Sequence, residues 1–166
     1  TSSYDCTCSV TDGRSPNNGT WIGIPAKPEA VSWDLGCPYC FYVSTENGEI
    51  LHYDVRSNTI PLFQQSIHQG PCTSISVNPS LPQLLATSGE DGYCRLWKVD
   101  DKQLIGVAER DMKLGNVFNC CFLFVVLCYI QKGGVTLDLY SVTNAADILA
   151  NSLYVFGAEA SQPVTK

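Results

Sequence analysis

The sequence predicts an all-β fold made of repeated, four-stranded antiparallel units, and three observations lead to it. Residues 84–98, LLATSGEDGYCRLWK, have the pattern of two strands joined by a tight turn at Asp91-Gly92 and closed by the large aromatic side chain of Trp97. The same pattern recurs at regular intervals along the chain. The 13 Gly and 9 Pro residues supply the turns that many short strands need.

The recurrence is seen when each turn is aligned with the turn at Asp91. The upstream copies turn at Asn47-Gly48 and, more weakly, at Asp5, and a downstream copy turns at Gly133-Gly134. The residue that closes each hairpin is Thr11, Tyr53, Trp97 or Tyr140, and these positions are 42, 44 and 43 residues apart. A period of about 40 to 45 residues is typical of the blades of a WD40 β-propeller.

The period divides the chain into parts. We expect the end of a truncated blade at 1–20, WD40 blades at 21–68 and 69–115, a degenerate blade at 116–157 and a polar C-terminal tail at 158–166. A closed propeller needs at least four blades, and the chain holds about three and a half. It also opens in the middle of a hairpin without an initiator Met, so a WD40 propeller fragment is the expected fold.

Several short stretches resemble one family of WD40 proteins in particular, the C-terminal part of periodic tryptophan protein 1. They are SYD and DGRSP within 4–16, STENG and DVRS in the second blade, SIHQ before the third, and ERDMKLG at 109–115. The resemblance implies a nuclear and nucleolar protein of ribosome biogenesis, active in ribosomal RNA transcription or processing and in large-subunit assembly. Its partners would be other proteins of pre-ribosomal or chromatin-associated assemblies.

The WD40 resemblance also implies a buried hydrogen-bonded network in the third blade. In the family a His bonds the Asp of the turn and, with a Ser or Thr, holds the Trp; carried over, this implicates His68, Thr87 or Ser88, Asp91 and Trp97. The same residue types could suggest a hydrolase, but no Gly-x-Ser-x-Gly motif accompanies them. The other blades lack the turn Asp and the Trp, so only the third should carry the full set. We therefore expect no catalytic residue.

Charge, hydropathy and cysteines exclude further classes. With a net charge of −6 and only ten Lys and Arg residues, direct nucleic-acid binding is disfavoured. The apolar run 117–130 is too short for a membrane span and predicts two buried strands. Most of the nine cysteines fit apolar strand positions, while Cys37 and Cys40 form a single CxxC for which zinc or redox roles stay open. No metal or cofactor is expected, and the odd count favours a reducing compartment.

Two stretches are candidates for binding other proteins. Tyr53-Asp54-Val55-Arg56 resembles the Trp-Asp-x-Arg box by which some WD40 proteins dock onto cullin-4 ubiquitin-ligase adaptors, although Asp54 and Arg56 could equally form a local ion pair. The second is the charged connection 109–115, with Arg110, Asp111, Met112 and Lys113. A substrate receptor of a cullin-4 ligase and a chromatin- or histone-binding protein are thus the alternatives to a ribosome-assembly scaffold. A methyl-lysine cage would require aromatic side chains such as Trp21, Trp33, Tyr39 and Tyr42 to converge.

Overall fold

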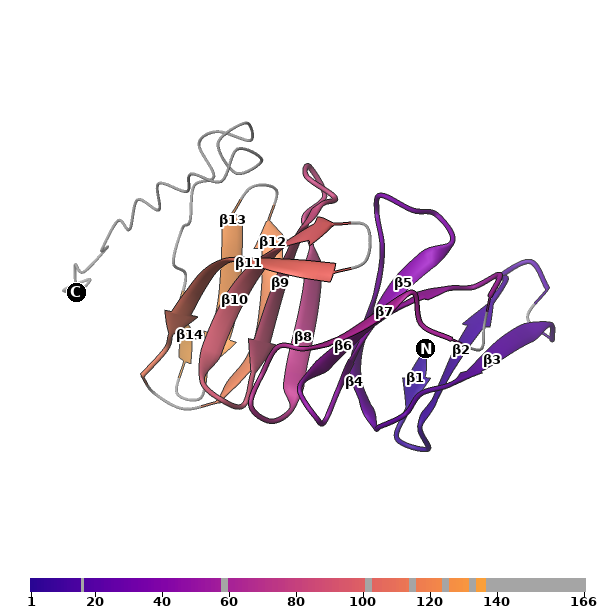
Figure 1. The fold of residues 1–166 in the computed structure, drawn as a ribbon, viewed down its shortest axis with the longest axis horizontal. Coiled ribbons are helices and arrows are strands. Elements are labelled where there is room, and N and C mark those ends of the chain that lie inside the picture. Colours follow the sequence, from indigo (N-terminus) through magenta and orange to yellow (C-terminus); the bar gives the residue numbers. More distant parts are fainter. Residues whose placement is uncertain are drawn as a thin grey trace, which may run out of the picture.

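The chain folds as a row of four antiparallel sheets that follow one another in the order of the sequence (Figure 1). The computed structural model describes residues 1–15, 17–57, 60–100, 103–113, 116–123, 126–131 and 134–136. Within these ranges all regular secondary structure is β-strand. The fold is all-β and is that of a WD40 propeller fragment. No helix in the described part of the chain is long and apolar enough to cross a membrane.

Each sheet takes its strands from one continuous stretch. The first contains β1 (Ser2–Ser3), β2 (Thr7–Thr11) and β3 (Gly19–Gly23), and the second β4 (Pro28–Trp33), β5 (Cys40–Thr45), β6 (Glu49–Asp54) and β7 (Phe63–Ser66). The third contains β8 (Cys72–Val77), β9 (Leu84–Gly89), β10 (Tyr93–Asp100) and β11 (Gln103–Asp111), and the fourth β12 (Val117–Leu123), β13 (Val126–Gln131) and β14 (Gly134–Thr136).

The first sheet ends later than the sequence predicts. Strand β3 pairs with β2 over its whole length, from Thr7 opposite Gly23 to Thr11 opposite Gly19. The predicted boundary between residues 20 and 21 therefore falls inside a strand and must move beyond Gly23, because an outer strand belongs to the sheet whose ladder it completes. The end of the predicted last blade, with Tyr140, and the predicted tail at 158–166 lie outside the described residues.

A left-handed turn residue marks the central hairpin of each of the first three sheets. Cys6, Gly48 and Gly92 have φ angles of 64°, 76° and 82°. The carbonyl of each accepts a backbone hydrogen bond from a residue that follows the outer strand of the same sheet: Ile24, His68 and Met112, at 2.8, 3.0 and 2.9 Å. Each connection to the next sheet is thereby fixed to the turn of the sheet it leaves.

The fourth sheet repeats the geometry of the others despite its degenerate sequence. Near the start of the inner strands β4, β8 and β12 the pairing register shifts between Pro28 and Ala30, between Cys72 and Ser74, and between Val117 and Asn119. Such bulges increase the local twist of a strand. The apolar run 117–130 forms two antiparallel strands as predicted, in which Leu123 pairs with Val126 across a two-residue connection.

The core consists of three apolar clusters. One is formed by residues of the first and second sheets around Val43 and Leu51, one by the second and third around Tyr42 and Leu85, and one by the third and fourth around Ala86 and Val117. Each sheet therefore buries its apolar faces against its neighbours, as expected of a repeat array. The outer strands of the second and third sheets are also joined, because the Gln65 amide donates to the Leu104 carbonyl and accepts from its N–H, at 2.9 and 2.8 Å.

Replacing Gly48 by Ala should destabilise the chain by roughly 3 kcal/mol, through strain in the left-handed region and overpacking. A Cβ at Gly48 would run into the backbone carbonyls of His68 and Gly70, neither of which can move without breaking the connection to the third sheet. Gly23→Ala is the matched control, because a Cβ there meets nothing within 4 Å. Urea unfolding of both variants checks this, and equal stabilities would contradict it.

Candidate functional site

His68 connects the second sheet to the third. It lies in the connection between β7 and β8, where its N–H donates to the Gly48 carbonyl of the second sheet at 3.0 Å. Its imidazole points into the third sheet and is fully buried, with 0% of the side chain exposed. Nδ1 lies 2.9 Å from Asp91 Oδ1, and Nε2 lies 2.9 Å from Thr87 Oγ1. A single residue thus binds two neighbouring blades.

The hydrogen bonds around His68 form a continuous chain. Because the charged Asp91 carboxylate can only accept, Nδ1–H of the imidazole donates to it at 2.9 Å. Nε2 of the neutral ring then accepts the Thr87 hydroxyl, and the Thr87 oxygen accepts the Trp97 indole N–H at 2.9 Å. Of the two hydroxyls that the sequence offered, the structure places Thr87 in this chain, while the Ser88 Oγ lies 3.2 Å from Thr73 Oγ1 instead.

Asp91 is the residue on which most of these contacts converge. Its Oδ1 accepts the backbone N–H of Tyr93 at 3.1 Å and its Oδ2 accepts that of Gln69 at 3.1 Å, so the carboxylate holds both the hairpin turn and the incoming connection. Burial raises the pKa of Asp91, but hydrogen bonds from Arg95, His68 and Gln69 outweigh burial and hold the pKa below its usual range. The carboxylate is therefore charged in the folded chain at neutral pH.

Arg95 completes the network and is the member that the sequence did not reveal. Its Nη1 donates to Asp91 Oδ2 at 2.8 Å and lies 2.6 Å from His68 Nδ1, and its Nε lies 3.4 Å from the Glu109 carboxylate. Burial lowers the pKa of His68, the hydrogen bond and charge of Asp91 raise it, and the charge of Arg95 lowers it again, with a net decrease. Arg95 therefore compensates the charge of Asp91 and adds a smaller contribution to the effect of burial on the pKa of His68.

The second sheet replaces the whole network by apolar contacts. The positions of His68, Thr87, Asp91, Arg95 and Trp97 in the third sheet correspond, by register and turn geometry, to five positions of the preceding blade. These are, in the same order, Ile24, Val43, Asn47, Leu51 and Tyr53. The four apolar members are buried in one cluster. Replacing a buried charge network as a unit by apolar side chains is often neutral or stabilising, whereas losing one member alone is costly. Leu51 stands where Arg95 stands in the third sheet, and this exchange is the signal that could have identified Arg95.

The charged stretch 109–115, predicted as a connection, begins inside a strand. Residues 109–111 belong to β11 and pair with β10, because the ladder of the third sheet extends to Tyr93 opposite Asp111. Met112 is only 8% exposed and packs against the fourth sheet, at the position that His68 takes one sheet earlier. Lys113 is exposed, with φ 56° and its N–H bonded to Asp111 Oδ1 at 2.8 Å. Met112 is thus a core residue, while Arg110, Asp111 and Lys113 stay at the surface.

Asp54 and Arg56 form a local ion pair at the end of β6. Arg56 Nη2 lies 2.6 Å from Asp54 Oδ2, and the Arg56 N–H donates to Asp54 Oδ1 at 2.9 Å. The hydrogen bonds from Arg56 lower the pKa of Asp54 to about 2. Asp12 and Arg14 repeat this geometry after β2, with Nη2 at 2.7 Å from Oδ2. Arg56 differs from Arg14 in that its guanidinium lies over the Tyr39 ring, 4.4 Å from the ring centre, and its side chain is still 63% exposed.

The aromatic residues considered for a cage do not converge on one point. Trp33 and Tyr39 are about half exposed, whereas Tyr42 is fully buried on the other face of the second sheet, stacked on His52. Trp21 lies in β3 and is exposed. The ring contacts in this region instead form a row in which Trp33 packs edge-on against Phe41, which stacks on Tyr53.

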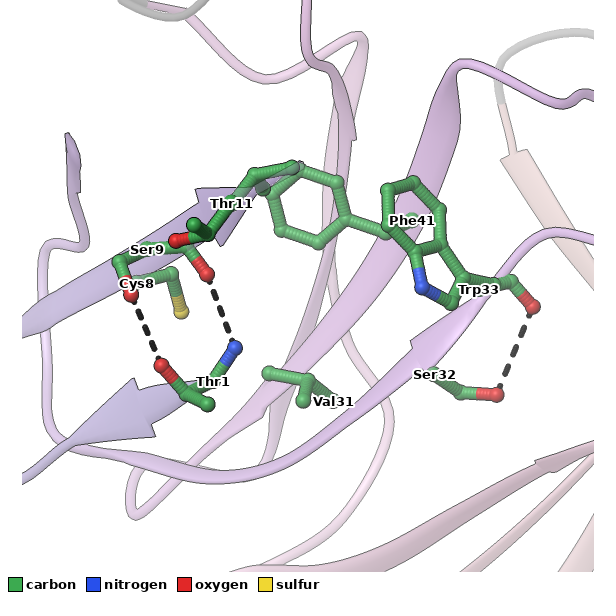
Figure 2. A pocket seen from close by; sticks show the side chains of 9 residues that line it. Thr1, Cys8, Ser9, Thr11, Val31, Ser32, Trp33 and Phe41 are labelled. Carbon is green, nitrogen blue, oxygen red and sulfur yellow. Dashed lines mark hydrogen bonds between the residues drawn. The ribbon is translucent and has the colours of Figure 1, made fainter. Parts of the chain in front are cut away.

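A hollow of about 240 Å³ separates β2 from β4 (Figure 2). Val31, Trp33 and Phe41 form one wall, and the hydroxyls of Thr1 and Ser9 on the other wall bond each other at 2.8 Å. Its volume is below that of usual small-molecule sites and its polar groups already have partners. The geometry gives no reason to assign it a ligand.

The described residues contain no group of three or more His, Cys, Asp or Glu side chains placed to hold a metal ion. A His, an Asp and a hydroxyl come together twice in the part of the chain that the structure describes. Around His68 the Thr87 hydroxyl already accepts from Trp97 and lies against the imidazole. Around Asp34 the carboxylate accepts the Tyr42 hydroxyl at 3.1 Å and lies 3.1 Å from His52 Nε2. The candidate site is therefore a surface on a rigid scaffold, around Tyr39 and Arg56, and the buried network holds the scaffold together.

Comparison with known proteins agrees with the repeated sheets. The chain is 34% identical over 99 residues to an uncharacterised WD repeat-containing protein of Schizosaccharomyces pombe, a match that covers 60% of this chain and 19% of that protein. In these comparisons the chain resembles WD-repeat proteins. It is also similar, at 23% identity over 110 residues, to the periodic tryptophan protein 1 homolog of Drosophila melanogaster, with 66% of this chain and 24% of that protein covered. No family model matches the chain.

The chain thus spans about a fifth to a quarter of the length of these curated relatives. WD-repeat proteins generally bind other proteins and are typically non-catalytic. The exposed side chains on the sheet ends, and not the buried polar groups, are where such binding would take place.

Replacing Asp91 by Ala should lower the free energy of unfolding by about 3 to 5 kcal/mol, because it leaves the charge of Arg95 without its counter-charge and the His68 imidazole without its hydrogen-bond acceptor. Asp12→Ala is the control: it also removes an Asp–Arg pair, but an exposed one, and should cost only a small fraction of that loss. Urea or thermal unfolding of the two variants checks the difference. Similar losses in both would show that the buried network does not stabilise the chain.

Proposed function

We propose that this WD-repeat chain is part of a non-catalytic scaffold that binds proteins during ribosome biogenesis, in the nucleus and nucleolus. The partners proposed are proteins of pre-ribosomal particles in ribosomal RNA production and large-subunit assembly. The proposal is supported by the similarity to the periodic tryptophan protein 1 homolog and by the ERDMKLG stretch that prompted it.

The observation that carries the non-catalytic part is the saturation of the His68 network. A hydrolase needs a hydroxyl that can reach a substrate, and the Thr87 hydroxyl is buried between Trp97 and His68. His68 itself is fully buried and neutral, because burial and Arg95 lower its pKa. The network has the properties of a structural clamp.

The proposed contact surface consists of Leu35, Tyr39 and Arg56, and we call it the β4–β5 surface. All three are exposed, and Tyr39 and Arg56 are held in place: the Val55 N–H donates to the Tyr39 carbonyl at 2.8 Å, and Asp54 and the Tyr39 ring fix the guanidinium. Tyr and Arg are enriched among the residues that dominate protein–protein binding energy. Because the surface is preorganised, a partner would lose little conformational entropy on binding it.

The acidic character of the chain favours protein partners over direct contact with nucleic acid. A net charge of −6 opposes a broad contact with phosphates, whereas exposed Arg56 and Lys113 can each meet a carboxylate on a protein surface. The residues 110, 111 and 113 next to the fourth sheet are a second proposed contact, with Met112 as its buried anchor.

Affinity purification of the full-length protein from cells tests this proposal. Wild type should recover pre-ribosomal proteins, and the double variant Tyr39→Ala, Arg56→Glu should recover at least several-fold less. Arg14→Glu is the matched control, because Arg14 has the same Asp-x-Arg geometry. A cullin-4 adaptor or histones as the main recovered proteins would instead support the ligase-receptor or chromatin alternative and overturn the ribosome-assembly proposal.

A further inference from the structure

The loop that carries Tyr39 also brings two cysteines together. Cys37 and Cys40 occupy the first and last positions of a turn closed by the Cys40 N–H, which donates to the Cys37 carbonyl at 3.0 Å, with Pro38 at the second position. Proline at the second position of such a turn fixes its backbone in advance. The two sulfur atoms lie 2.7 Å apart, between the length of an S–S bond, about 2.05 Å, and an ordinary contact.

The turn is held from both sides. Asp34 fixes its start, since its carboxylate accepts the Gly36 N–H at 2.8 Å and its carbonyl accepts the Cys37 N–H at 3.3 Å. Cys40 fixes its end as the first residue of β5, because its carbonyl accepts the Asp34 N–H at 2.9 Å. The sulfur atoms are thus kept adjacent by the backbone, and closing a bond between them would require little rearrangement.

We propose that Cys37 and Cys40 are a thiol modification site. Low-molecular-weight disulfides such as glutathione disulfide would oxidise the two thiols to an intramolecular disulfide. The two thiols alone do not make a metal site, since no third ligand accompanies them within the described part of the chain. The proposal goes beyond protein binding and does not depend on the identity of any partner.

The order of the steps follows from exposure. Cys37 is partly exposed and Cys40 is buried, so the Cys37 thiolate attacks glutathione disulfide, its S–S bond breaks and one glutathione leaves as a thiolate that takes up a proton. Burial and the neighbouring Cys37 raise the pKa of Cys40 to about 12, which makes Cys40 the resolving thiol and not the first nucleophile.

In the second step the Cys40 sulfur loses its proton and attacks the Cys37 sulfur, and the second glutathione leaves. In total two protein thiols lose two electrons and two protons, and one glutathione disulfide is reduced to two glutathione molecules. Because Tyr39 lies between the two cysteines, the new disulfide would restrict the conformation of the loop that forms part of the β4–β5 surface.

To test this, the folded full chain is incubated with glutathione disulfide and the free thiols are then blocked in acid. The products are identified by intact mass and located by peptide mapping. Wild type should lose two hydrogens in a peptide that links Cys37 to Cys40, without retained glutathione at either. Cys40→Ser should instead stop at a glutathione adduct on Cys37. Cys6→Ser is the matched control, since Cys6 is partly exposed in another turn and should leave the 37–40 product unchanged.

Two results would overturn the proposal. One is a stable glutathione adduct on Cys37 in the wild type with Cys40 still free. The other is a 37–40 link that forms no faster in the folded chain than in urea, where the turn is lost. A trivalent arsenical that bridges adjacent thiols gives an independent readout: at least tenfold tighter retention by wild type than by Cys37→Ser supports the pair, and equal retention refutes it.

Discussion

The Asp91 carboxylate is the contact on which the third blade and its attachment to the second depend. It caps the β9–β10 turn, accepts the N–H of Gln69 in the incoming connection and holds both His68 and Arg95. The His68 backbone is bonded at the same time to Gly48 of the preceding sheet. One buried charge therefore fixes a turn, a connection and the relative position of two blades, and it is tolerated because a guanidinium and several hydrogen bonds compensate it.

Neighbouring blades meet the same geometric requirement with different chemistry. The position that follows each outer strand is Ile24, His68 or Met112, and each donates its N–H to a left-handed turn residue and inserts its side chain into the next sheet. Where the side chain is apolar, the facing positions are apolar too, as with Val43 and Leu51. The backbone pattern is thus the same in each blade, while the side chains at these positions form either a polar network or an apolar cluster. Binding specificity then resides in the exposed loops, among which 34–40 combines an aromatic, an arginine contact and two adjacent thiols.

The periodicity of turns predicted the repeated sheets well, because a left-handed turn residue and a closing aromatic are local features of the chain. It predicted the strand boundaries less well: β3 reaches across a loop to complete the first sheet, and β11 continues through the charged residues 109–111, since ladders depend on partners distant in sequence. Four members of the network followed from the family pattern, but Arg95 did not, because its role arises only when β10 places it beside Asp91 and His68. Met112 looked like part of a charged loop because its burial comes from the next sheet.

The protonation of His68 tests the central claim, that the network is a closed structural clamp, more directly than any stability measurement. Burial and Arg95 lower its pKa below the ordinary value of 6.5, so the unfolded chain takes up a proton in a range where the folded chain does not, and acid should reduce stability. Nitrogen-15 NMR of the imidazole in the folded chain should therefore show a titration midpoint below 6.5, with the proton of the neutral ring on Nδ1. A midpoint at or above 6.5, or a neutral ring with its proton on Nε2, would contradict the account.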